Sequence, residues 1–105
     1  MTEPVLPPSG RATVVLDIGA DTGALVLNTA AGLDGREIEI SPCEGGHRTH
    51  SQVRQRHIGG TVRYAAVYPG LQAGDYVLWR DPGTPEMTVT IAGGQVTSAD
   101  WPGQL

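Results

Sequence analysis

The sequence predicts an all-β domain: a sandwich of seven or eight short strands joined by Greek-key connections. Apolar and polar residues alternate with a period of two in several short segments, which recur about every 8 to 12 residues. The chain contains 15 glycines and 8 prolines, a composition that suits many tight turns. No segment longer than about ten residues has the period of an amphipathic helix. Together these observations favour two stacked sheets over a helical fold.

The chain of 105 residues is long enough for one domain. Residues 1–10 hold three prolines and little apolar content, so we expect a flexible N-terminal lead-in. The sandwich is expected over residues 11–101, followed by a short C-terminal tail over residues 102–105.

The first half of the domain predicts an opening hairpin and a half-buried strand. β-Branched residues are frequent over 13–18, and a second apolar run follows over 24–29 after the turn sequence Asp-Thr-Gly. Residues 36–40 alternate, with Ile38 and Ile40 facing one way and two glutamates facing the other. Residues 48–56 are mostly polar, which indicates an edge strand or a long excursion.

The second half contains four further strands with turn signals between them. They are predicted over residues 62–68, 76–79, 87–91 and 96–99. Asp81-Pro82-Gly83 is a strong turn signal. Gly93-Gly94 has the composition of a two-residue hairpin turn, which predicts that the last two strands form a hairpin.

Charge and hydropathy exclude several classes of function. The net charge of −4 argues against a general nucleic-acid binder or a protein held on anionic membranes, because both need a positive field. No stretch approaches the roughly 20 apolar residues of a spanning helix. The N-terminus carries an acidic residue and no apolar signal-peptide core, so we expect a cytoplasmic protein. The single cysteine, Cys43, excludes a disulfide within the chain.

Leu71, Gly74 and Tyr76 form the one motif with structural specificity. In many Greek-key sandwiches this spacing precedes a strand, and the tyrosine ring packs in the core while its hydroxyl bonds to nearby main chain. Glycine supplies a backbone geometry that a β-carbon would hinder. We therefore assign these three residues a structural role and not a catalytic one.

Three segments of the chain resemble prealbumin-like β-sandwich modules, which have an immunoglobulin-like architecture. Residues 33–40 (LDGREIEI) resemble their opening strand, residues 64–79 (YAAVYPGLQAGDYVLW) their aromatic–turn–Leu–x–x–Gly–x–Tyr segment, and residues 87–101 (MTVTIAGGQVTSADW) their closing hairpin. The families most similar by motif are the carboxypeptidase-regulatory-like domains and the collagen-adhesin B-type (SpaA-like) repeats. The resemblance covers residues 33–101 and implies a fold, but no particular function.

Two departures limit what this resemblance implies. Adhesin B-type repeats often carry a Lys–Asn or Lys–Asp isopeptide bond, and this chain contains no lysine. Transthyretin-like hydroxyisourate hydrolases end in a Tyr-Arg-Gly-Ser tetrapeptide, whereas this chain ends in Trp-Pro-Gly-Gln-Leu. Neither the cross-link nor that hydrolase activity is therefore expected.

The residues with the richest chemistry fall between positions 43 and 57. Cys43, His47 and His50 have a spacing that suits a transition-metal site, since thiolate and imidazole ligands favour zinc or copper. The spacing is not a recognised zinc signature, because a second cysteine pair and a helical histidine pair are missing. We therefore expect no cofactor and keep a zinc or copper site as an alternative.

The same segment offers a candidate binding surface for an anion or a protein partner, made of His47, His50, Arg54, Arg56 and His57. If residues 48–56 are extended, alternate side chains share a face that can donate forked hydrogen bonds to carboxylate or phosphate groups. That face would contain His50, Gln52, Arg54 and Arg56. The simpler interpretation is that the arginines pair with Glu37 and Glu39 on a neighbouring strand, and that the segment blunts a sheet edge.

The leading hypothesis is a non-catalytic binding or accessory module that binds another protein or forms a homo-oligomer, because the fold motifs are clear and no catalytic constellation is present. The first alternative is a small transition-metal-binding protein that uses Cys43, His47 and His50. The second is a small hydrolase on a transthyretin-like scaffold, which needs a pocket that collects His50, Arg54 and His57.

Overall fold

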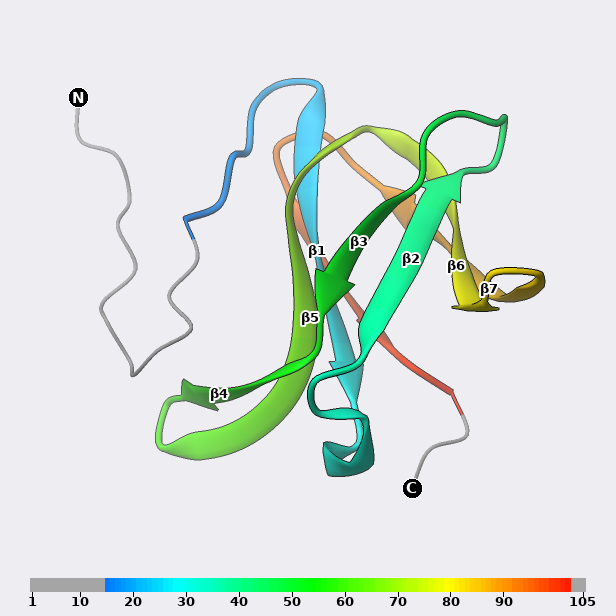
Figure 1. The fold of residues 1–105 in the computed structure, drawn as a ribbon. Helices are drawn as coiled ribbons and strands as arrows, with labels where there is room; N and C mark the ends of the chain where they lie inside the picture. The colour runs from blue at the N-terminus through cyan, green and yellow to red at the C-terminus, as the bar shows by residue number, and fades with distance from the viewer. Residues whose placement is uncertain (1–14, 103–105) are drawn as a thin grey trace.

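Two four-stranded sheets pack face to face in the computed structural model, which describes residues 15–102 (Figure 1). Sheet A has the order β4-β5-β1-β8 and sheet B the order β3-β2-β6-β7. The strands are β1 (Thr22–Thr29), β2 (Glu37–Pro42), β3 (Thr49–Gln52), β4 (Arg54–Ile58), β5 (Thr61–Gln72), β6 (Gly74–Asp81), β7 (Thr84–Ile91) and β8 (Val96–Asp100), with a short 3-10 turn over Ala31–Leu33. The predicted all-β sandwich is confirmed. The expected lead-in over residues 1–10 lies outside the described residues, as does most of the expected tail.

The core follows from the two-residue alternation of the central strands. Leu25 and Leu27 of β1, together with Ile38 and Ile40 of β2, point between the sheets and are almost fully buried. Leu78, Ile91 and Tyr68 complete the same cluster from the neighbouring strands. Each aliphatic side chain of this kind contributes about 1.5–3 kcal/mol when it leaves water. The glutamates that alternate with the two isoleucines therefore lie on the outer face of sheet B.

One side of the sandwich is closed by a strand that changes sheets. β3 is the edge of sheet B and β4 is the edge of sheet A, and only Val53 separates them. The Val53 side chain is fully buried, its N–H donates to Arg36 O at 2.8 Å, and its carbonyl accepts from Gly35 N at 2.8 Å. The polar segment over residues 48–56, predicted as an edge strand or a long excursion, thus forms the edge strand of sheet B and then the edge strand of sheet A.

Two side-chain hydrogen bonds hold the sheets together near this crossing. The Tyr68 hydroxyl, on β5 of sheet A, donates to the carbonyl oxygen of Ile38 on β2 of sheet B at 2.7 Å. The Ser51 hydroxyl, on β3, donates to Val67 O on β5 at 2.7 Å. Each bond satisfies a polar group between two apolar layers, where an unpaired group is costly.

The other side of the sandwich corrects the predicted closing hairpin. The turn at Gly93-Gly94 does not pair β7 with β8, because β7 belongs to sheet B and β8 to sheet A, where it runs parallel to β1. Gly94 N donates to Thr22 O at 3.0 Å, so the turn is fixed against the start of β1. A β-carbon on Gly93 would collide with the backbone carbonyl of Ala20. The two glycines therefore serve a crossing between sheets.

The predicted opening hairpin is also wrong. β1 is a central strand with β5 on one side and β8 on the other, so neither of its edges is free for residues 13–18. Within that segment, residues 15–18 form no strand, and Asp17 N instead donates to Pro69 O on β5 at 2.8 Å. Residues 13 and 14 lie outside the described part of the chain.

The tyrosine motif takes the predicted structural role. The Tyr76 hydroxyl donates to Gln72 O, four residues earlier, at 2.7 Å, and the side chain is 6% exposed. Leu71 is buried beside it, and Gly74 has φ of 147°, a value that favours glycine. Burial, with a smaller contribution from the charge of Glu44, raises the pKa of Tyr76.

Replacing Tyr68 with phenylalanine should lower the free energy of unfolding by about 1–3 kcal/mol, because the Ile38 carbonyl loses its partner between the sheets. Burial raises the pKa of Tyr68, so the folded state retains the phenolic proton more tightly than the unfolded state. Above about pH 10 the unfolded chain loses this proton first, and the wild-type unfolding free energy falls as pH rises. Urea denaturation from pH 7 to alkaline pH should show a shallower alkaline fall for Y68F.

Tyr64→Phe is the matched control, since the Tyr64 hydroxyl accepts an exposed, 3.4 Å bond from the side chain of Gln55. Its unfolding free energy should stay within about 0.5 kcal/mol of wild type. A Y68F protein with wild-type stability at pH 7 and a wild-type alkaline slope would show that this bond does not join the sheets.

Candidate functional site

The structure separates the candidate residues between positions 43 and 57. Cys43 and His47 lie in the loop between β2 and β3, and His50 lies on β3. All three side chains are exposed. No group of three or more His, Cys, Asp or Glu side chains within residues 15–102 is placed to hold a metal ion. Cys43, His47 and His50 are thus not brought together as a ligand set.

The face predicted to hold His50, Gln52, Arg54 and Arg56 does not form. His50 lies opposite Glu39, so it belongs to the outer face of sheet B. Arg54 lies opposite Ala65 of β5 and belongs to the outer face of sheet A. The change of sheet at Val53 places these two faces on opposite sides of the sandwich, a feature that simple alternation could not reveal.

His57 takes a third direction. It lies opposite Val62 on β5, on the other face of β4 from Arg54 and Arg56. The hairpin formed by β4 and the start of β5 extends away from the sandwich, at the lower left of Figure 1. The pocket that a hydrolase would need, collecting His50, Arg54 and His57, is therefore not formed by these residues.

Arg56 Nε donates to Ala65 O at 3.2 Å, and burial, followed by the charge of Arg54, lowers the Arg56 pKa.

A groove on the outer face of sheet B is the more promising site. It is open, with a volume of about 230 Å³, and lies over β2 and the end of β6. Its lining residues are Arg36, Glu37, Glu39, Trp79, Arg80, Asp81 and Pro82. Aromatic, acidic and basic side chains converge there because Glu39 and Trp79 lie opposite each other on adjacent strands and share the outer face.

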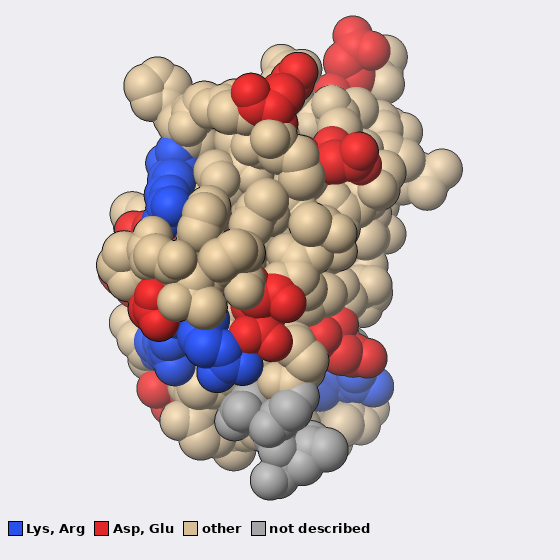
Figure 2. All heavy atoms as spheres, turned by 90° about the vertical axis from the view of Figure 1, so that its right-hand side faces the viewer, with Lys and Arg blue, Asp and Glu red and all other residues tan. Residues whose placement is uncertain are grey.

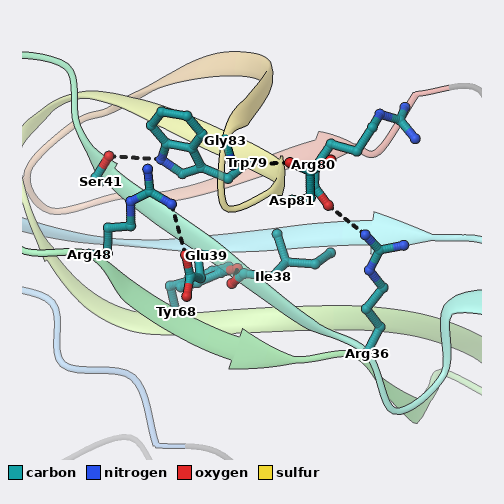
Figure 3. Close-up of polar contacts among 10 residues, drawn as sticks. All are labelled: Arg36, Ile38, Glu39, Ser41, Arg48, Tyr68, Trp79, Arg80, Asp81 and Gly83. Atoms are coloured by element: carbon teal, nitrogen blue, oxygen red, sulfur yellow. Dashed lines mark hydrogen bonds and ion pairs between the residues drawn. The ribbon is translucent and has the colours of Figure 1, made fainter.

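Trp79 is the centre of this site (Figure 3). Its indole N–H donates to the buried Ser41 hydroxyl at 2.9 Å, which fixes the ring against β2. The guanidinium carbon of Arg48 lies 3.7 Å from the ring centroid, and Arg48 Nη1 donates to Glu39 Oε1 at 2.9 Å. At partly exposed positions the stack and the ion pair are each worth about 0.5–1 kcal/mol. Arg48 is thus held in a defined place by weak interactions.

Three hydrogen bonds fix the residues at the far end of the groove. Arg36 Nη2 donates to Arg80 O at 2.5 Å (Figure 3). The Arg80 side chain pairs instead with Glu86, with Nε 2.5 Å from Oε1. The hydrogen bond to Glu86 raises the pKa of Arg80. Asp81 Oδ1 accepts from Gly83 N at 3.0 Å, and this bond lowers the Asp81 pKa. Glu37 makes no ion pair with a described residue.

The sequence contained part of the signal for this groove. The alternation that buries Ile38 and Ile40 also places Glu37 and Glu39 outward, and their pairing with an arginine was the simpler interpretation of the charges. Arg48 pairs with Glu39, but Arg54 and Arg56 lie on β4 of sheet A and not beside these glutamates. What the sequence could not supply is the register that sets Trp79 opposite Glu39.

No protein-family model, curated protein or solved structure matches this chain. The likeness to prealbumin-like modules therefore stays a prediction. No helix within residues 15–102 is long and apolar enough to cross a membrane. The cytoplasmic location expected from the sequence also stays a prediction.

Breaking the Arg48–Glu39 pair should cost little stability, because both side chains are partly exposed. We expect Glu39→Gln and Arg48→Ala each to lower the free energy of unfolding by less than about 1 kcal/mol. Urea denaturation measures this, with Glu37→Gln as the control in which no ion pair is lost. A loss of several kcal/mol would mean that the pair belongs to the framework of the fold.

Proposed function

We propose that this chain is a non-catalytic binding module that acts through protein–protein contact, and that its partner is a second copy of itself. The observation that carries this proposal is the free edge of β7. This strand of eight residues pairs only with β6 among the described strands. The outer edge of such a strand presents N–H and C=O groups that another strand can pair with.

The two sides of the sandwich differ in a way that favours this edge. On one side, β3 and β4 also end their sheets, but these strands have only four and five residues, and the chain joins them directly at Val53. On the opposite side, β7 and β8 are the terminal strands of their sheets, and only the turn over residues 92–95 connects them. β8 is shorter, with five residues, so β7 offers the longer edge.

Only the second half of β7 lacks the features that usually protect an edge, because the first half contains Pro85 and Glu86 and pairs irregularly with β6. Residues 87–91 (MTVTI) carry no charge, proline or glycine, and their β-branched residues suit a strand. Thr88 and Thr90 are exposed on the outer face. Figure 2 shows the side of the molecule that faces right in Figure 1, where a broad area without charged atoms lies above a cluster of acidic and basic side chains. Two antiparallel copies of β7 related by a twofold axis would join both B sheets into one sheet.

Thr88→Glu tests this proposal by adding a carboxylate to the exposed middle of β7. Two copies bring two such charges into one small area, where like charges repel. Light scattering after size-exclusion chromatography, at about 10–300 µM protein, should show a wild-type dimer and a T88E dissociation constant at least about tenfold higher. Thr61→Glu, at the exposed start of β5, makes the same charge change away from β7 and should leave the dimer intact.

Two results would overturn the proposal. One is a wild-type protein that stays monomeric across this concentration range. The other is a dimer that T88E leaves unchanged or that T61E disrupts equally, since either would place the contact elsewhere.

A further inference from the structure

We propose that the groove beside Trp79 is a second protein-contact site that accepts an arginine side chain of a partner, in competition with the chain's own Arg48. The inference is independent of β7 pairing, because the groove lies on the outer face of sheet B over β2 and β6 and not at the β7 edge. The proposed partner is an arginine-bearing segment of another protein.

The chain itself shows which ligand the site recognises. Arg48 places its guanidinium 3.7 Å from the centroid of the Trp79 ring and donates to Glu39 at 2.9 Å, the two interactions that an aromatic ring and a carboxylate offer to a planar cation. The ring is prepared for this, since Ser41 holds its N–H at 2.9 Å and fixes its orientation. Figure 3 shows these groups gathered on the outer side of β2 and β6.

Arg48 is well suited to being displaced. It precedes β3, at the end of the loop that follows Pro42, and 34% of its side chain remains exposed. Its side chain contacts Glu39 and Trp79. A partner arginine that takes the same place therefore breaks no contact with the core, and Arg48 can return to solvent.

The space next to Arg48 favours a peptide segment over an isolated cation. Arg48 is not one of the lining residues of the groove, which adjoins it at Trp79 and Glu39 and extends to Glu37, Asp81 and Pro82. Glu37 makes no ion pair with a described residue. Arg36 lies at the far end, where its guanidinium is held by Arg80 O. A peptide segment whose arginine stacks on Trp79 can thus lie along the open groove, which is lined by acidic and basic side chains.

The test uses the full chain and follows the Trp79 indole N–H signal by NMR during titration with acetyl-arginine amide. Arg48→Ala should bind this probe saturably and at least about fivefold more tightly than wild type, because the internal competitor is gone. Adding Glu39→Gln to Arg48→Ala should remove that gain. Arg63→Ala, which removes an arginine from sheet A, should behave as wild type. Acetyl-citrulline amide, which has nearly the same shape but no charge, should bind at least about fivefold more weakly to Arg48→Ala.

Several outcomes would overturn the inference. The absence of a saturable shift in a folded Arg48→Ala protein would show that no guanidinium site exists, and equal binding of the citrulline probe would show that charge is not recognised. Binding unaffected by Glu39→Gln would place the probe elsewhere. Free arginine that binds at least about tenfold more tightly than the capped amide would assign the site to an amino acid and not to a partner protein.

Discussion

The sandwich depends on one crossing, where a single polar segment passes from sheet B to sheet A at Val53. The buried valine anchors the crossing in the core, and its backbone bonds to Gly35 and Arg36 fix it against the start of β2. The Tyr68–Ile38 hydrogen bond then ties the inner strands of both sheets at the same side. The edge strands on this side, β3 and β4, have only four and five residues, whereas β7 on the opposite side has eight.

The sequence predicted which residues form strands better than it predicted where those strands go. Alternation in 36–40, 62–68, 76–79 and 87–91 matched β2, β5, β6 and β7, because a sheet with one buried face imposes that pattern. The sequence indicates less clearly which strands lie next to each other in a sheet. Gly93-Gly94 has the composition of a hairpin turn, yet it connects two sheets. Tertiary packing decides that β8 pairs with β1 in sheet A and not with β7 in sheet B.

The candidate site was predictable only in its parts. Glu37 and Glu39 were placed on an outer face, and the pairing of an arginine with that face followed from charge. The role of Trp79 was not visible, because only the register of β6 against β2 puts its ring beside Glu39 and Ser41. Conversely, the spacing of the histidines and Cys43 suggested a shared site. The buried Val53 in the middle of the segment places its two halves on different faces of the sandwich.

The parallel pairing of β8 with β1 has a consequence for how the protein emerges during synthesis. β1 occupies residues 22–29, and its partner β8 occupies residues 96–100, so the Asn28 side chain bonds to Asp100 across 72 positions. Contacts of such separation slow folding, because a long loop must close before they form. Sheet A therefore keeps β1 as an open edge until residues 96–100 have left the ribosome. During translation this edge of β1 is synthesised before β7 and stays unpaired until β8 follows.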